Sequence, residues 1–287
     1  MYRNFVSQEE IDLEYNMALT VPGIDNRLKD YSEKSKIVRK KSACFLDVKY
    51  GPAIDETVDI FPAKKEGASL LFFIHGGYWV RCRSKDFSYL AAGLVNHGIS
   101  VAIGNYSHCP KVSISEITRQ NRALVAWLHQ EGNSFGIDPS SIVVAGHSAG
   151  GQQVGMLLNT DWQGLYDLPN DVIKGGIPIS GIFDLAPLFY SYLQPKLQLT
   201  HQLITNQSPQ LHIPKSKVPL LVSVGEKETS EFRRQTIEYF QAWSDKGNPG
   251  KRWVEKGKNH FSIIESLHDP SSSFCQTIVD FVRQTKV

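Results

Sequence analysis

The 287-residue chain carries 31 basic and 29 acidic side chains, a near balance that gives no concentrated positive field for nucleic acid. Hydrophobic residues make up 41% and charged residues 21%, which excludes disordered and fibrous proteins and predicts a sizeable core. The first residues lack the apolar stretch of a secretory signal, and no apolar run approaches the roughly 20 residues that span a bilayer. We therefore expect a cytoplasmic protein that binds neither nucleic acid nor a membrane.

Short β-rich runs alternate with helix-like segments along the chain, a pattern typical of βα units that build a mostly parallel sheet. The first two strands are predicted as an antiparallel edge and the rest as parallel. The predicted strands are 44–48, 58–61, 70–74, 100–103, 142–145, 176–179, 220–224 and 252–255. Apolar residues at helical spacing predict crossover helices over 113–129 and 232–243.

Two segments fit this alternation poorly. Residues 1–40 are polar, and residues 185–217 are rich in Leu, Gln, Pro and Tyr with weak periodicity. No internal repeat, low-complexity tract or linker divides the chain. We expect one α/β domain over residues 1–287, with an eight-stranded twisted sheet, helices on both faces and these two segments as a small cap.

A strand, sharp turn and helix are predicted around Gly146-His-Ser-Ala-Gly-Gly151, which interrupts an apolar run and precedes helix-compatible residues. This is the context in which G-x-S-x-G forms a nucleophile elbow. Glycines two residues either side of the serine prevent collisions with the strand and the helix in a strained turn. We predict Ser148 as a nucleophile at a helix N-terminus, where backbone donors favour a developing negative charge.

A glycine-containing loop, His75-Gly-Gly-Tyr-Trp79, directly follows the apolar strand 70–74. Its backbone N–H groups can point at a developing oxyanion, and we predict the amides of Gly77 and Tyr78, with that of Ala149, as the oxyanion hole. His75 ends the strand, where it is expected to shape the loop and not to act as a base. Tyr78 and Trp79 fit a role as core aromatics or as pocket walls equally well.

A catalytic serine needs a histidine base, and in this fold the chain order is serine, acid, histidine. His260 is predicted as the base because it lies in a loop just after the strand 252–255, where the fold places this residue. His268 comes later, beside Asp269 in what reads as a surface turn.

Three glutamates compete for the acid that orients the histidine. Glu228 is predicted, because it stands three residues past Gly225 and can reach back over the sheet edge. Glu226 stays as the alternative, and Glu231 fits the first turn of a helix.

With these residues in place, the chain resembles the kynurenine formamidases, or arylformamidases, of the α/β-hydrolase superfamily. The resemblance covers most of the chain and includes an aromatic HGGYW where general esterases have HGGG. The matching motifs are HGGYW at 75–79, GHSAGG at 146–151, SGIFDL at 180–185 and ETSEFRRQ at 228–235, followed by His260-Phe261. The family usually carries Asp at the position of Glu228, and glutamate serves as the triad acid in other hydrolases.

The resemblance implies hydrolysis of N-formyl-L-kynurenine to kynurenine and formate through a formyl-enzyme on Ser148. A tiny acyl group and a large aromatic leaving group imply an aromatic pocket, for which we name Trp79, Phe183 and Phe261 besides Tyr78. Arg81 and Arg83 are candidate partners of the substrate carboxylate, but a surface position is the favoured interpretation for both.

Two alternatives remain open. A general carboxylesterase or amidase acting on small esters or carbamates shares the triad and differs only in pocket and cap. The other alternative is a binding protein with the hydrolase fold that keeps the serine but catalyses no turnover.

No metal-ligand cluster appears and a triad needs no cofactor, so we expect a small-molecule substrate and neither metal nor organic cofactor. The oligomeric state is not decided, and a homodimer stays open.

Overall fold

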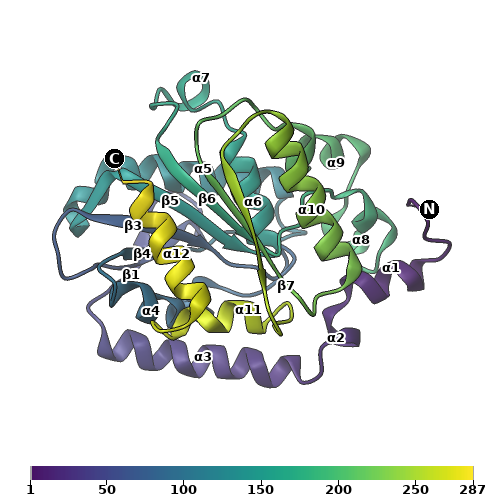
Figure 1. The fold of residues 1–287 in the computed structure, drawn as a ribbon, viewed down its shortest axis with the longest axis horizontal. Coiled ribbons are helices and arrows are strands. Elements are labelled where there is room, and N and C mark those ends of the chain that lie inside the picture. The colour runs from purple at the N-terminus through teal and green to yellow at the C-terminus, as the bar shows by residue number, and fades with distance from the viewer. Residues whose placement is uncertain (1, 287) are drawn as a thin grey trace.

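A twisted eight-stranded sheet forms the centre of the computed structural model, which describes residues 2–286 (Figure 1). The strands lie in the order β1-β2-β4-β3-β5-β6-β7-β8, in which β2 pairs antiparallel with β1 and β4 and the other neighbours are parallel. They are β1 Phe45–Lys49, β2 Thr57–Phe61, β3 Ala68–Ile74, β4 Ser100–Gly104, β5 Ile137–His147, β6 Ile173–Ile179, β7 Leu220–Gly225 and β8 Gly250–Glu255. All eight predicted strands and the antiparallel edge are confirmed.

The strand β5 begins five residues before the predicted start at 142. Ile137 pairs with Ala68 of β3 in a register that shifts before Leu70 pairs with Ile142. Residues 138–140, which are Asp-Pro-Ser, lie in this irregular stretch, so the alternation of apolar residues that predicts strands does not reveal it. The central strands β3, β4 and β7 are buried along their whole length, as expected for a sheet covered on both faces.

Helices cover both faces of the sheet. The helices α4 and α12 contact each other on one face, and α5 and α6 contact each other on the opposite face (Figure 1). The helices from the sheet onward are α4 Ala91–Val95, α5 Ile114–Glu131, α6 Ala149–Leu158, α7 Trp162–Tyr166, α10 Ser230–Asp245, α11 Ser262–Glu265 and α12 Ser273–Gln284, with short 3₁₀ turns at Ser84–Asp86, Ser88–Leu90, Gly132–Phe135 and Ser266–His268. The predicted crossover helices are confirmed as α5 and α10.

The two segments predicted as a cap meet at one end of the molecule. The N-terminal segment forms α1 Gln8–Tyr15, α2 Met17–Thr20 and α3 Ile24–Lys41, and α3 runs along the lower edge of the protein in Figure 1. Residues 185–217 form the helices α8 Gln194–Leu197 and α9 His201–Gln207 and the 3₁₀ turns Ala186–Tyr190 and Pro209–Leu211. The turn Ala186–Tyr190 contacts α1.

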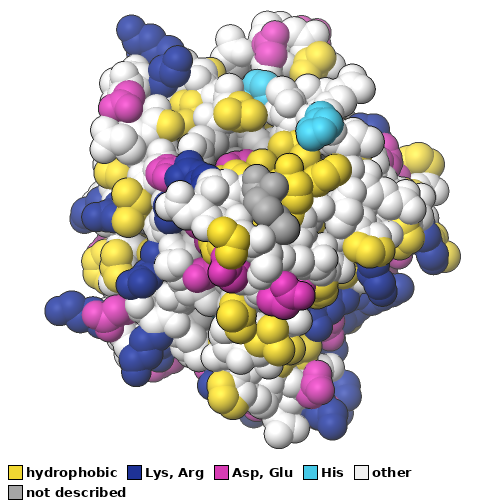
Figure 2. Space-filling view, turned by 90° about the vertical axis from the view of Figure 1, so that its right-hand side faces the viewer, with side chains coloured by type: hydrophobic (Ala, Val, Ile, Leu, Met, Phe, Trp, Pro, Cys, Tyr) yellow, Lys and Arg dark blue, Asp and Glu magenta, His cyan; other side chains and the backbone are white. Residues whose placement is uncertain are grey.

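Figure 2 shows the end of the molecule where the N-terminal segment begins. Acidic, basic and hydrophobic side chains are interspersed on this face, and hydrophobic ones gather near its centre. Within residues 2–286, every helix is too short or too polar to cross a bilayer. The cytoplasmic location stays a prediction.

Two glycines of the nucleophile turn stand where no side chain fits. A Cβ on Gly150 would lie 2.0 Å from the carbonyl oxygen of Ile74 at the end of β3, and a Cβ on Gly146 would lie 2.3 Å from the carbonyl oxygen of Gly150. The sequence motif predicts glycine at both positions because any side chain there would collide with the backbone. The turn after β5 is therefore packed directly against the backbone of β3.

We predict that Gly150→Ala lowers the free energy of unfolding by about 1–3 kcal/mol, the usual cost of forcing extra atoms into a packed interior. Urea denaturation of the purified variant measures this change. Gly132→Ala is the matched control, because its Cβ would meet nothing closer than 3.6 Å and its φ of −55° is helical. Equal unfolding midpoints for Gly150→Ala and the unsubstituted protein would contradict the tight packing.

Candidate active site

Ser148 lies in the sharp turn between β5 and α6 with φ 57° and ψ −117°, a strained conformation for a residue other than glycine. Its N–H donates to the carbonyl of Ile179 at the end of β6 (2.9 Å), and its carbonyl accepts from the N–H of Gln152 (3.2 Å). Only 3% of Ser148 is exposed, and it lines a cavity above the sheet. The backbone thus fixes its side chain at a defined point of the cavity wall.

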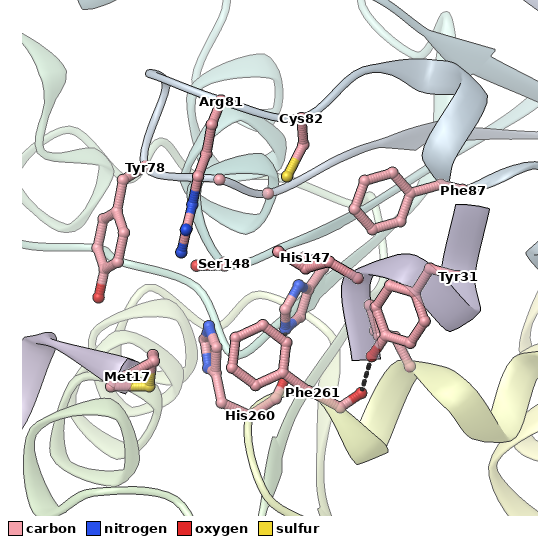
Figure 3. A pocket seen from close by; sticks show the side chains of 14 residues that line it. Met17, Tyr31, Tyr78, Arg81, Cys82, Phe87, His147, Ser148, His260 and Phe261 are labelled. Atoms are coloured by element: carbon pink, nitrogen blue, oxygen red, sulfur yellow. Dashed lines mark hydrogen bonds between the residues drawn. The ribbon is translucent and has the colours of Figure 1, made fainter. Parts of the chain in front are cut away.

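His260 and Glu228 come from the loops that follow β8 and β7. The distance from His260 Nδ1 to Glu228 Oε2 is 2.7 Å, and both side chains are buried. Because a carboxylate accepts, Nδ1 carries the hydrogen, and Nε2 of the neutral ring is left as an acceptor. The His260 ring points toward the Ser148 side chain across the same cavity (Figure 3).

The other oxygen of Glu228 is also held. Its Oε1 accepts from the N–H of Gly225 (2.7 Å) and from the hydroxyl of Ser180 (2.5 Å). Sequence analysis did not assign Ser180, although it directly follows β6, the strand beside β7. Three hydrogen bonds therefore fix the Glu228 carboxylate below the imidazole.

The competing glutamates are engaged elsewhere. Glu226 accepts from the N–H of Gly257 (2.8 Å) at the surface. Glu231 lies in the first turn of α10 and pairs with Arg234 (2.6 Å). Of the three glutamates, Glu228 is the one that the structure brings to His260.

The loop after β3 turns sharply beside Ser148. Gly77 has φ 113° and Tyr78 has φ 51°, and both residues line the cavity. Among the residues that the structure describes, the N–H groups of Gly77, Tyr78 and Ala149 donate to no other protein group. Gly77 and Tyr78 line the cavity, so their amides are available to a ligand there.

His75 lies below this loop, outside the cavity wall. Its Nδ1–H donates to the carbonyl of Gly76 (2.8 Å), and its ring stacks on Tyr106 with 4.3 Å between centroids. Complete burial lowers the pKa of His75 to about 3, which keeps the ring neutral. Its contacts are those of a residue that shapes the loop.

His147, the residue before Ser148, lines the cavity and was not assigned from the sequence. Its Nε2–H donates to the backbone carbonyl of His260 (2.7 Å), since a carbonyl oxygen only accepts. Burial lowers the pKa of His147 well below its ordinary value, so the ring stays neutral. This bond connects the nucleophile turn directly to the loop that carries His260.

Of the three side chains predicted for the pocket, Phe261 lines this cavity, whereas Trp79 and Phe183 lie outside its wall. Trp79 turns into the core and donates from Nε1 to Gln152 of α6 (3.2 Å), while Phe183 stacks on Tyr239 with 4.0 Å between centroids. Trp79 has a positive φ of 58°, an unusual backbone angle that a motif does not show.

Other side chains supply the wall. The structure brings Met17 of α2 and Leu28 and Tyr31 of α3 to the cavity, together with Phe87 and Ile264. The hydroxyl of Tyr31 donates to the carbonyl of Phe261 (2.9 Å), as Figure 3 shows. The lining includes no residue of 185–217. Within residues 2–286, no three His, Cys, Asp or Glu side chains gather as metal ligands.

Comparisons with known proteins identify the family of this chain. The BD-FAE family model matches residues 58–171. The kynurenine formamidase of Danio rerio is 30% identical over 280 residues, which are 92% of each chain, and that of Drosophila melanogaster is 26% identical over 240 residues, covering 80% of this chain and 79% of the relative.

Solved structures show the same fold. A thioesterase candidate from Silicibacter sp. TM1040 is 29% identical, with a TM-score of 0.81 over 95% of this chain and 99% of that chain. Esterase B of Lactobacillus rhamnosis, 14% identical, has a TM-score of 0.72 over 98% of this chain and 97% of that chain. The fold is that of the α/β-hydrolases, as predicted, and the chain belongs to the kynurenine formamidase family of these enzymes.

Proposed function

We propose that this hydrolase cleaves the formamide of N-formyl-L-kynurenine to give kynurenine and formate, with Ser148, His260 and Glu228 as its catalytic triad. One observation carries the proposal: the strained serine and the carboxylate-paired histidine face a single cavity with aromatic walls. The names of the relatives from fish and fly support the choice of substrate.

In the proposed mechanism, Ser148 Oγ attacks the formyl carbon while His260 Nε2 takes the hydroxyl proton. The carbonyl oxygen becomes an oxyanion, which the amides of Gly77, Tyr78 and Ala149 stabilise. When the C–N bond breaks, His260 gives its proton to the departing aniline nitrogen. A water molecule, deprotonated by His260, then attacks the formyl ester and releases formate and free Ser148.

The aromatic wall suits the proposed leaving group. The formyl carbon needs little room beyond the oxyanion amides, whereas the aminophenyl ring needs apolar surface. Tyr31, Phe87 and Phe261 offer that surface around the cavity. A site with a small acyl space and a larger aromatic space favours formyl groups on aromatic amines over long acyl chains.

We also propose that the N-terminal segment serves as the cap of this site. Met17, Leu28 and Tyr31 contribute to the cavity wall from α2 and α3. The hydroxyl of Tyr78 donates to the carbonyl of Tyr15 at the end of α1, which ties the oxyanion loop to the same segment. Residues 185–217 remain a predicted part of the cap, and a homodimer remains open.

The substrate is tested by steady-state kinetics on N-formyl-L-kynurenine and p-nitrophenyl acetate, side by side. We expect a far higher kcat/KM for formylkynurenine, because its small acyl group and aromatic leaving group fill the cavity. A series of aryl esters with longer acyl chains should be cleaved progressively more slowly. The reverse preference would favour a general esterase, the activity named for several relatives and structural neighbours.

The role of Glu228 is tested by Glu228→Gln, which keeps the side-chain shape and removes the charge that stabilises the imidazolium. We predict a loss in kcat of about 10³- to 10⁴-fold, as for the equivalent change in other triads. Glu226→Gln is the matched control, since Glu226 bonds only the Gly257 amide at the surface. Similar rates for both variants would exclude Glu228 as the acid.

A further inference from the structure

One arginine lies in the cavity wall, which otherwise consists of uncharged apolar and aromatic side chains, glycines, Ser148 and two histidines. Within residues 2–286, Arg81 is the only lysine or arginine side chain that lines it, and no acidic side chain does. Arg81 follows the oxyanion loop, and its guanidinium extends into the cavity toward Ser148, between Tyr78 and Cys82 (Figure 3). A cation at this position attracts a negatively charged group of a ligand bound beside Ser148.

Arg81 has no partner of its own. It forms no salt bridge, and its side chain donates no hydrogen bond to any residue between 2 and 286. Several other arginines are engaged, as Arg27 with Glu265 (2.7 Å), Arg119 with Glu56 (2.6 Å) and Arg234 with Glu231 (2.6 Å). All the donors of the Arg81 guanidinium are thus available to a ligand.

The backbone holds Arg81 in a fixed relation to the oxyanion amides. Its N–H donates to the carbonyl of Gly77 (3.2 Å), as does the N–H of Val80 (3.0 Å). The chain folds so tightly that a Cβ on Gly77 would lie 2.2 Å from the carbonyl oxygen of Arg81. One turn therefore presents both the oxyanion amides and the side chain of Arg81, a solvent-exposed residue that also lines the cavity.

We propose that Arg81 binds a carboxylate on the leaving group and thereby makes the site selective for anionic substrates. This inference rests on the proposed function, because the kynurenine moiety carries a carboxylate at the end remote from its formamide. A guanidinium matches a carboxylate with two parallel hydrogen bonds, whereas it gains nothing from the ester of an uncharged alcohol. In this proposal the formyl group lies at Ser148, the ring lies against the aromatic wall, and the carboxylate of the amino-acid end pairs with Arg81.

The test compares formylkynurenine with formylkynuramine, which lacks only the carboxylate. We expect the unsubstituted enzyme to prefer formylkynurenine in kcat/KM, and Arg81→Met to reduce that preference by about 10- to 100-fold, as for loss of a charged hydrogen bond. The change should appear mainly in KM, and kynurenine should become a correspondingly weaker product inhibitor. Arg83→Met, which removes the same charge two residues away and outside this cavity, should keep the preference.

A merely structural role for Arg81 predicts a different result. Arg81→Met would then lower kcat/KM for both formamides by the same factor and leave kynurenine inhibition unchanged, and this would overturn the proposal. Arg81→Lys, which keeps the charge but not the paired donors, should retain part of the preference.

The design also separates this inference from the proposed function. If the unsubstituted enzyme cleaves aryl esters and neither formamide, the proposed function fails. The same variants are then assayed on phenyl acetate and on the acetate ester of 3-(3-hydroxyphenyl)propionate. A preference for the carboxylate-bearing ester that Arg81→Met removes supports a carboxylate site, and an equal preference in both proteins overturns it.

Discussion

The site depends on the close approach of two backbone turns at the carboxyl ends of β3 and β5. Gly150 leaves no room for a Cβ beside the Ile74 carbonyl, and Gly76 would place its own Cβ 3.1 Å from that of Ser148. This contact puts the strained serine directly beside the amides of Gly77 and Tyr78. Larger residues in either turn would move Ser148 away from these amides, so the glycines are a geometric requirement of the site.

The parallel sheet supplies the remaining geometry, because the loops that follow its strands meet at one edge. Glu228 follows β7 and His260 follows β8, neighbouring strands whose loops lie next to each other. Ser180, after β6, completes the carboxylate environment, and His147 bonds the carbonyl of His260. Buried hydrogen bonds of this kind fix the orientation of an imidazole more strictly than packing alone. The proposed triad thus follows from the strand order.

The sequence predicted the features that depend on local pattern or strand order: the eight strands, the serine turn and the approach of Glu228 to His260. It failed where side-chain direction depends on unusual backbone angles or distant segments. Trp79 at positive φ packs in the core, whereas Arg81, exposed as expected, also lines the cavity from the same turn, which the sequence did not indicate. Tyr31 reaches the wall from a helix more than 100 residues before the serine, which no local motif indicates.

The central claim is that Ser148 is the nucleophile, and covalent labelling tests it most directly. The enzyme is incubated with a fluorophosphonate, its residual activity is followed, and the modified peptide is located by mass spectrometry. The account predicts one phosphonyl group on Ser148, inactivation in step with labelling, and no adduct on Ser148→Ala. An active enzyme that takes up no label, or a label on another residue that persists in Ser148→Ala, would contradict it.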